Sequence, residues 1–350
     1  MKRTICLALL FAVLCVLCNG CNDWMGGEYL SITPHKAQPE AYANRVIEVT
    51  SYTQLRNAVA NLVRTGAEDG IISISAFNRG TIHFYVDTAI SNVIENTAFG
   101  AYAVEKITYE LGTNRGVSVA AFQIHYRSGY QPNSKITEIE NAQEMYDAVI
   151  DALESFERRI LAHTEQYEKI DVASIVSQYS ALYPDRIVEV PEVTISTYPD
   201  KGAERIVEIS FEYEMDQLRL QQMRSKVEDH FRTAELSVRG IDDATEVYNQ
   251  LFIHLTSQYT YSSTLSANPV YRLFEKGEGD EKTVADVFSR ICTRIGLGCN
   301  TVVGTKNGQK YAWNAVQIHG KYYNVDLLQC VERQEFHLLT DADLEKYKAD

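Results

Sequence analysis

The sequence has few cysteines and prolines, little positive charge and, after its first twenty residues, no long hydrophobic segment. Seven cysteines and seven prolines occur in 350 residues, and no Cys-x-x-Cys pair lies beyond residue 21. A structural zinc site is therefore not expected. The histidines are scattered, so no metal and no cofactor are predicted. The formal net charge of −14 argues against nucleic acid as a partner. The length exceeds that of one typical core, which favours several domains.

The first twenty residues have the composition of a secretory signal peptide. A positively charged start is followed by an apolar run from Ile5 to Cys18, which is too short to span a bilayer as a mature helix. Gly20 precedes Cys21 as in the processing site of bacterial lipoproteins, although that pattern usually has Leu where Cys18 stands. We expect residues 1–20 to be removed and Cys21 to be lipidated, which would anchor the protein to the outer face of a membrane. Plain secretion is the alternative.

Two segments of the chain resemble each other at a constant offset. After a tether or linker over residues 21–45, residues 47–59 resemble residues 137–149, and alternating apolar and polar segments follow both. We predict an α+β fold with two small duplicated modules, over residues 46–130 and 135–216. Each module should contain strand, helix, strand, helix and a hairpin. The middle strand of the second module, near 160–167, has a weak pattern that leaves a helix open.

A connecting helix is predicted over residues 217–239, and residues 240–350 carry an ordered set of motifs. They are Val247-Tyr-Asn-Gln-Leu251, the approach from Tyr271 to Gly277, the Gly-rich segment Gly296–Gly304, and a hairpin from Tyr311-Ala-Trp-Asn314 to Asp326. In order and spacing these motifs resemble the bacterial transglutaminase-like superfamily. The resemblance implies a papain-like α+β domain with a triad of Cys, His and Asp.

Two of the three triad positions lack the residue that the resemblance implies. The nucleophile position, four residues before Ala285, holds Glu281, and the His position holds Tyr311, while Asp326 is kept. In the family chemistry a thiolate attacks a carbonyl carbon, the His pairs with the thiolate and the Asp orients the His. A tyrosine with an ordinary pKa of about 10 cannot replace the imidazole near pH 7. Glu281 has a simpler use at the N-terminus of a helix.

We therefore expect an exported, non-catalytic domain that acts in binding or scaffolding at the cell surface. Its partner would be a protein, a peptide or a cell-wall component, and the resemblance places Trp313 and Asn314 at the cleft. The alternative is an enzyme of altered chemistry, a hydrolase or acyl transferase, in which Glu281 and Asp326 form a carboxylate pair beside Tyr311.

The remaining candidate residues are acidic side chains and cysteines. Glu278, Asp280, Glu281 and Asp326 offer oxygen ligands for calcium, but no spaced loop such as an EF-hand accompanies them, so a solvated acidic loop is favoured. Cys292 and Cys299 fit core positions of a helix and a strand. Cys330 could form a disulfide with Cys299, and an odd number of cysteines after the leader leaves at least one thiol free.

Overall fold

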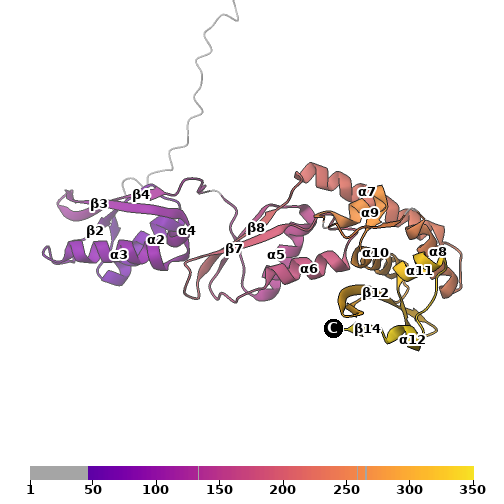
Figure 1. Cartoon of the computed structure of the whole chain (residues 1–350). Helices are drawn as coiled ribbons and strands as arrows, with labels where there is room; N and C mark the ends of the chain where they lie inside the picture. Colours follow the sequence, from indigo (N-terminus) through magenta and orange to yellow (C-terminus); the bar gives the residue numbers. More distant parts are fainter. Residues whose placement is uncertain (1–45, 133, 258, 265) are drawn as a thin grey trace, which may run out of the picture.

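The computed structural model describes residues 46–350 except residues 133, 258 and 265. The signal peptide, Cys21 and the tether lie outside the described residues. Three parts, two small α+β modules and a larger C-terminal domain, lie in a row along the chain (Figure 1). Within the described residues, every helix is too short or too polar to cross a membrane.

The first module is a four-stranded sheet covered by helices. Strand β1 runs parallel to β2, while β4 pairs antiparallel with both β2 and β3, which gives the order β1-β2-β4-β3. The Ser51 side chain accepts a hydrogen bond from the Gln54 amide and so caps α2, as expected for a polar residue just before a helix. The elements are β1 (Ile47–Glu48), α2 (Tyr52–Arg64), β2 (Asp69–Ser73), α3 (Ile82–Asn96), α4 (Ala98–Ala103), β3 (Val104–Asn114) and β4 (Val117–Tyr126).

The second module repeats this sheet order with its own strands. Its order is β5-β6-β8-β7, again with the first pair parallel and the others antiparallel. The weak segment near 160–167 forms a strand, β6, and not a helix. The second module has the predicted order of elements, the first has one additional helix, α4, before its hairpin, and the origin of the two by duplication stays a prediction. The elements are β5 (Thr137–Glu138), α5 (Ala142–Ser155), β6 (Arg159–Thr164), α6 (Val172–Leu182), β7 (Glu192–Tyr198) and β8 (Arg205–Glu212).

The C-terminal domain follows a long connecting helix, α7 (Gln217–Ser237). Helix α8 is capped by Asp243, whose side chain accepts a hydrogen bond from the Glu246 amide. A four-stranded antiparallel sheet of order β13-β12-β11-β14 packs against α10. The elements are α8 (Ala244–Thr256), β9 (Thr260–Tyr261), α9 (Pro269–Lys276), β10 (Glu278–Gly279), α10 (Glu281–Arg294), β11 (Cys299–Lys306), β12 (Gln309–Ile318), β13 (Lys321–Val325), α11 (Leu327–Arg333), α12 (Asp341–Leu344) and β14 (Tyr347–Ala349).

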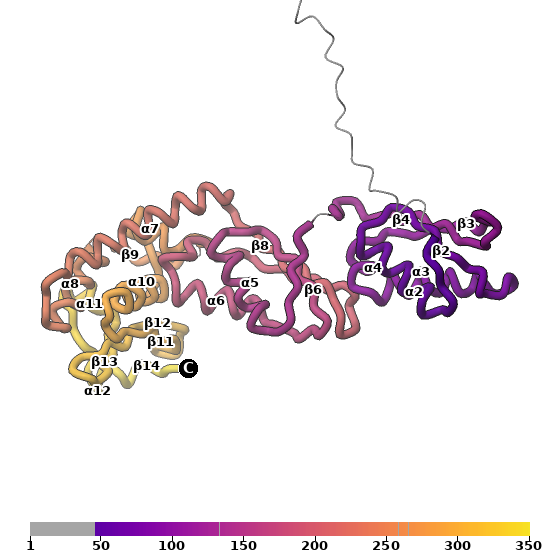
Figure 2. The backbone as a smooth tube through the Cα atoms, turned by 180° about the vertical axis from the view of Figure 1, so that it is seen from behind, coloured from indigo at the N-terminus to yellow at the C-terminus, as the bar shows by residue number. Residues whose placement is uncertain are grey.

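The buried apolar residues form two clusters that do not follow the three parts. One cluster runs from Val49 to Ile124 and lies within the first module. The other runs from Ile139 to Cys330 and joins the second module, α7 and the C-terminal domain in one core. In the view from behind, α7 spans both of these parts (Figure 2). The second module and the C-terminal domain are therefore one packed unit, while the first module has its own core.

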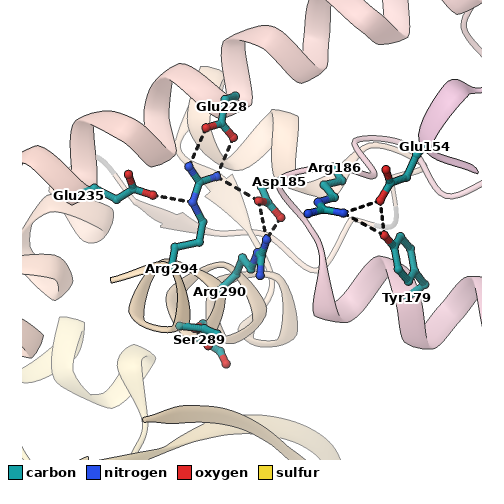
Figure 3. Close-up of polar contacts among 10 residues, drawn as sticks. Glu154, Tyr179, Asp185, Arg186, Glu228, Glu235, Ser289, Arg290 and Arg294 are labelled. Carbon is teal, nitrogen blue, oxygen red and sulfur yellow. Dashed lines mark hydrogen bonds and ion pairs between the residues drawn. The ribbon is translucent and has the colours of Figure 1, made fainter. Parts of the chain in front are cut away.

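A network of ion pairs reinforces the junction inside the larger unit (Figure 3). Asp185, in the segment after α6, is only 4% exposed and accepts hydrogen bonds from Arg290 Nε and Nη2 at 2.8 and 3.0 Å. Arg294 of the same helix bonds Asp185 at 3.0 Å and also pairs with Glu228 and Glu235 of α7. Side chains from the second module, α7 and α10 thus meet at the Arg294 guanidinium. Because these charges are largely shielded from water, the loss of one partner should be costly.

Candidate active site

Two tight turns bring the triad positions together on the C-terminal sheet. The pairs Asn307-Gly308 and His319-Gly320 all have positive φ angles, from 47° to 79°, as two-residue hairpin turns require. They connect β11 to β12 and β12 to β13. Tyr311 lies on β12, and Asp326 follows the end of β13. The hairpin predicted from the sequence therefore places the His position beside the Asp position.

Asp326 is the best satisfied carboxylate in this region, because donors of the chain surround it. It is 1% exposed. Its Oδ1 accepts the backbone N–H groups of Leu328 and Gln329 at 3.1 and 3.2 Å, which makes it the N-cap of α11. The Tyr311 hydroxyl lies 3.1 Å from both carboxylate oxygens. Lys306 Nζ donates to Oδ2 at 2.7 Å.

A second tyrosine, Tyr347 of β14, completes this group. Its hydroxyl donates to Oδ2 of Asp326 at 2.6 Å. Lys306 Nζ lies 4.6 Å from the ring centre of Tyr311 and 5.3 Å from that of Tyr347, so two aromatic faces and one carboxylate hold this ammonium. We name Lys306, Tyr311, Asp326 and Tyr347 the Asp326 cluster.

The electrostatics of the Asp326 cluster oppose proton transfer by its tyrosines. Burial and the neighbouring Asp326 carboxylate raise the pKa of Tyr311 far above its ordinary value. Burial and the hydrogen bond to Asp326 do the same to the pKa of Tyr347. Both hydroxyls therefore stay protonated at any physiological pH. A group that acts as a general base needs a pKa near the working pH, and neither hydroxyl meets that condition.

Gly304 lets the C-terminal strand reach this position. It pairs with Tyr311 on one side and with Ala349 of β14 on the other. A Cβ atom at Gly304 would lie 2.1 Å from the backbone oxygen of Lys348, so a larger residue would push β14 away. The close approach of β14 in turn brings Tyr347 over Asp326. Gly304 therefore allows Tyr347 to join the Asp326 cluster.

Glu281 is the first residue of α10, as the sequence predicts for the nucleophile position. Asp280 caps the helix by accepting the Thr283 amide at 2.8 Å. The half-buried Glu281 carboxylate lies near Tyr261 and Tyr311, whose pKa values are raised first by burial and in addition by this charge. A carboxylate in the first turn of a helix is stabilised by the positive end of the helix dipole. Glu281 thus has a structural role, and no thiol stands in its place.

The three described cysteines do not supply a nucleophile. Cys292, Cys299 and Cys330 are all buried and all free, so the predicted Cys299–Cys330 disulfide is wrong. Cys299 has Cys292 as its neighbour, and the sulfur of Cys330 contacts His337 at 3.5 Å instead. Burial raises the pKa of the Cys330 thiol to about 11 and that of Cys292 well above its ordinary value. Thiols of this kind are protonated and unreactive.

Trp313 and Asn314, which the resemblance places at the cleft, are both buried. Trp313 is 3% exposed and donates from Nε1 to Asn324 Oδ1 at 2.9 Å, with its ring packed on Tyr347. Asn314 is fully buried on the other face of β12, where its amide donates to the Ala285 carbonyl at 2.9 Å. The Asn therefore ties the sheet to α10. Alternation of side chains along a strand separates these two neighbours.

The acidic residues that could have bound a metal or formed a catalytic pair have other partners. Glu278 is paired with Arg272, Asp280 caps α10 and Asp326 is enclosed by its cluster. Among the residues that the structure describes, no group of three or more His, Cys, Asp and Glu could hold a metal ion. A glycosidase needs two carboxyl groups that face a substrate. Because donors of the chain enclose Asp326, it does not face a substrate together with Glu281.

Sequence reasoning missed two members of the Asp326 cluster, Lys306 and Tyr347. They lie 20 and 21 positions from Asp326 in the chain. Neither belongs to a motif of fixed spacing. The one usable signal is Gly304 in a β-strand, because a glycine there often marks a close approach of another backbone.

Together these features define the class of domain. A helix that begins at the nucleophile position packs against a sheet whose hairpin carries the other two positions, which is the layout of a nucleophile–base–acid triad. A family model described as "Transglutaminase-like superfamily" matches residues 232–327. This part of the chain is a transglutaminase-like domain, and the fold prediction for it is confirmed.

Three solved structures match this chain at low similarity. One is described as a TGase, at 10% identity and a TM-score of 0.29, with 62% of this chain and 65% of that chain covered. A candidate cysteine protease from Cytophaga hutchinsonii has 12% identity and a TM-score of 0.27, with coverages of 46% and 71%. A candidate protease from Parabacteroides distasonis has 7% identity and a TM-score of 0.24, with coverages of 74% and 40%. The chain thus spans less than two thirds of the TGase structure. No curated protein sequence matches this chain.

Proposed function

We propose that this protein binds a partner at the cell surface through a transglutaminase-like domain that does not catalyse acyl transfer. The observation that carries the proposal is the enclosure of Asp326. In a working triad this carboxylate would orient a histidine. Here it accepts from Lys306, Tyr311, Tyr347 and two backbone amides, so its hydrogen-bonding capacity is used to hold the fold together.

The other two triad positions support the same proposal. Glu281 is a weak nucleophile toward amides, and Tyr311 keeps its proton. A missing base alone would leave a slow enzyme, but the nucleophile is missing as well. The described thiols are buried in the core and cannot take its place. Binding remains as the use of the domain, and the partner would be a protein, a peptide or a cell-wall component.

We further propose that the protein is exported and lipid-anchored at Cys21. Support comes from the leader sequence, with its short apolar run and the Gly before Cys21. Fatty-acid labelling of cells that express the protein tests the anchor. Incorporation into the natural sequence and its loss in Cys21→Ser support lipidation. Equal labelling of both, or no labelling of either, contradicts it.

Catalysis is tested on the purified chain from residue 21 onward. An amine-incorporation assay and a peptidase assay should both give no turnover above the buffer control. The matched control is Glu281→Ala, which removes the nucleophile-position carboxylate at a half-buried site. Turnover by the natural chain that disappears in Glu281→Ala would overturn the proposal. Capture from a cell-envelope extract on the immobilised chain, followed by identification of what is retained, then searches for the partner.

A further inference from the structure

The first module meets the second through the short helix α4, which contacts strands β7 and β8 (Figure 1). On the second module, the contact uses the face of the sheet that points away from the core. Leu161 and Ile206 of that face are buried although they belong to neither apolar cluster. The ring of Tyr102 packs on Tyr198 at a centroid distance of 5.3 Å. Because this contact is mainly apolar, the charge of a group buried in it should affect how firmly the two modules hold together.

His163 of β6 lies on this face between two carboxylates, and it is only 8% exposed. Its Nδ1 lies 2.6 Å from Glu138 Oε2, and its Nε2 lies 3.2 Å from Glu204 Oε1. The ring also packs on Phe99 of α4, at a centroid distance of 5.2 Å. Side chains from β5, from the turn before β8 and from the first module therefore meet at one imidazole.

Only the doubly protonated ring satisfies both carboxylates. A neutral imidazole carries one N–H group, so it donates to one carboxylate and turns a lone pair toward the other. The imidazolium donates from both nitrogens, and hydrogen bonds between charged groups are strong. Since the contact with Glu138 is the shorter one, the neutral ring keeps its proton on Nδ1. Nε2 and the Glu204 carboxylate then repel each other.

Glu204 has room to leave when this repulsion arises. Its side chain is 52% exposed and lines a cavity of about 260 Å³ together with Arg56 and Arg64 of α2. Helix α4 carries no charged residue that could take the place of the imidazolium. The nearby charged side chains of β6 and β8 bond elsewhere, Arg159 and Glu208 to each other and Arg205 to the Gly202 carbonyl.

We propose that His163 is a pH-sensitive switch that holds the first module on the second. While the ring is doubly protonated, it binds Glu138 and Glu204 beneath Phe99, and the modules stay docked. When the pH rises and the ring loses one proton, Glu204 turns away and the contact beneath Phe99 opens. Imidazole is the side chain that ordinarily changes its charge between about pH 5 and 8. Docking is therefore strongest where the carboxylates are ionised and the ring is still protonated. This inference does not rest on the function proposed above.

The test is the distance between two nitroxide spin labels, measured by pulsed electron paramagnetic resonance in the chain from residue 21 onward. The labels are attached through Thr88→Cys on α3 and Gln178→Cys on α6, both at exposed positions. Cys21→Ser removes the one cysteine outside the described residues, and the other three are buried. The distance distribution should be narrow at about pH 6, and its width should at least about double at about pH 8.5. Equal widths at the two pH values overturn the proposal.

Three variants show whether His163 is the group that titrates, each with circular dichroism to verify its fold. His163→Gln cannot carry the charge, so its distribution should be broad at both pH values. Glu204→Gln can donate from its amide to the neutral Nε2, so its distribution should be narrow at both. His125→Gln changes an exposed histidine of the first module and should respond as the natural chain does. A pH response that persists in His163→Gln or in Glu204→Gln, or that is lost in His125→Gln, overturns the proposal.

Discussion

Replacement of Asp326 by alanine should destabilise the transglutaminase-like domain strongly, because the carboxylate supports the fold from several sides. The change removes the N-cap of α11, which costs about 1 kcal/mol. It also leaves Lys306 and two tyrosine hydroxyls without their acceptor. Loss of one partner of a buried ion pair costs roughly 3–5 kcal/mol. Lys306 keeps 24% of its side chain exposed, so the lower end applies and the total is about 4 kcal/mol.

The assay is urea unfolding followed by tryptophan fluorescence. The chain has two tryptophans, and Trp313 packs on Tyr347 at a centroid distance of 5.2 Å. In a Trp24→Phe background, Trp313 is therefore the sole reporter of this domain. With a slope of about 2–3 kcal/mol per molar urea, a loss of about 4 kcal/mol lowers the midpoint by roughly 1.5–2 M. Asp326→Asn keeps one oxygen as acceptor for the two backbone amides and the Tyr311 hydroxyl, but Tyr347 and Lys306 lose Oδ2. This variant keeps the helix cap and should cost roughly 3 kcal/mol.

The control is Asp341→Ala, an exposed carboxylate in the same domain, which should change stability by no more than about 0.5 kcal/mol. A catalytic carboxylate behaves in the opposite way, because its loss reduces turnover and leaves stability largely intact. A cost below about 1 kcal/mol for Asp326→Ala would therefore refute the reasoning that Asp326 has become a structural residue.

Three further predictions concern the larger unit. Asp185→Asn should lower stability by roughly 3 kcal/mol, because it leaves the largely buried Arg290 without its counter-charge and removes one of the three carboxylates around Arg294. A change in melting temperature no larger than that of Asp200→Asn, at an exposed position, would contradict this. Burial raises the pKa of the Glu189 carboxyl group in the folded chain. The carboxyl group therefore contributes its full stability below the unfolded-state pKa of about 4.3, and this contribution is lost as the pH rises through the folded-state pKa. Glu189→Gln should thus gain stability over the natural chain between about pH 4 and about pH 7, while the exposed control Glu192→Gln should show no such trend. Cys292, Cys299 and Cys330 are the cysteines of the chain from residue 46 onward, and a thiol reagent should modify none of them in the native state and all three in urea. Fast labelling of the native chain would contradict their burial.

The sequence was sufficient for the elements whose signals are local. Alternation and helical periodicity predicted the strand and helix order of the second module and, apart from α4, of the first, and the family resemblance of Tyr311–Asp326 predicted the hairpin. The position of Glu281 at the N-terminus of a helix was also predicted, because an acidic residue before an apolar helical pattern is a local signal. The class of the C-terminal domain followed from the order of several such patterns.

What could not be predicted depends on contacts between distant segments. The acceptor capacity of Asp326 is filled by Lys306 and by Tyr347, a residue on a strand of three residues near the end of the sequence. The predicted Cys299–Cys330 disulfide is wrong because the sequence indicated that Cys299 lies on a strand but not that Cys292 is its neighbour in the core. The burial of Trp313 and Asn314 was missed for a similar reason. The side chain of Tyr347, from β14 of the same sheet, covers Trp313, while α10 covers Asn314 on the other face of the sheet.

The two separate cores have a consequence for how the molecule responds to stress. The first module has an apolar cluster of its own and meets the second module through α4, where Tyr102 packs on Tyr198, so we expect it to unfold in a separate transition. Damage to the second module, in contrast, should spread through α7 to the transglutaminase-like domain, because one core serves both. Heating should therefore reveal two transitions. The hairpin β7–β8 should melt together with the distant Asp326 cluster and not with the sheet of the first module. Cooperativity in this chain follows shared packing and crosses the boundary between repeat and domain.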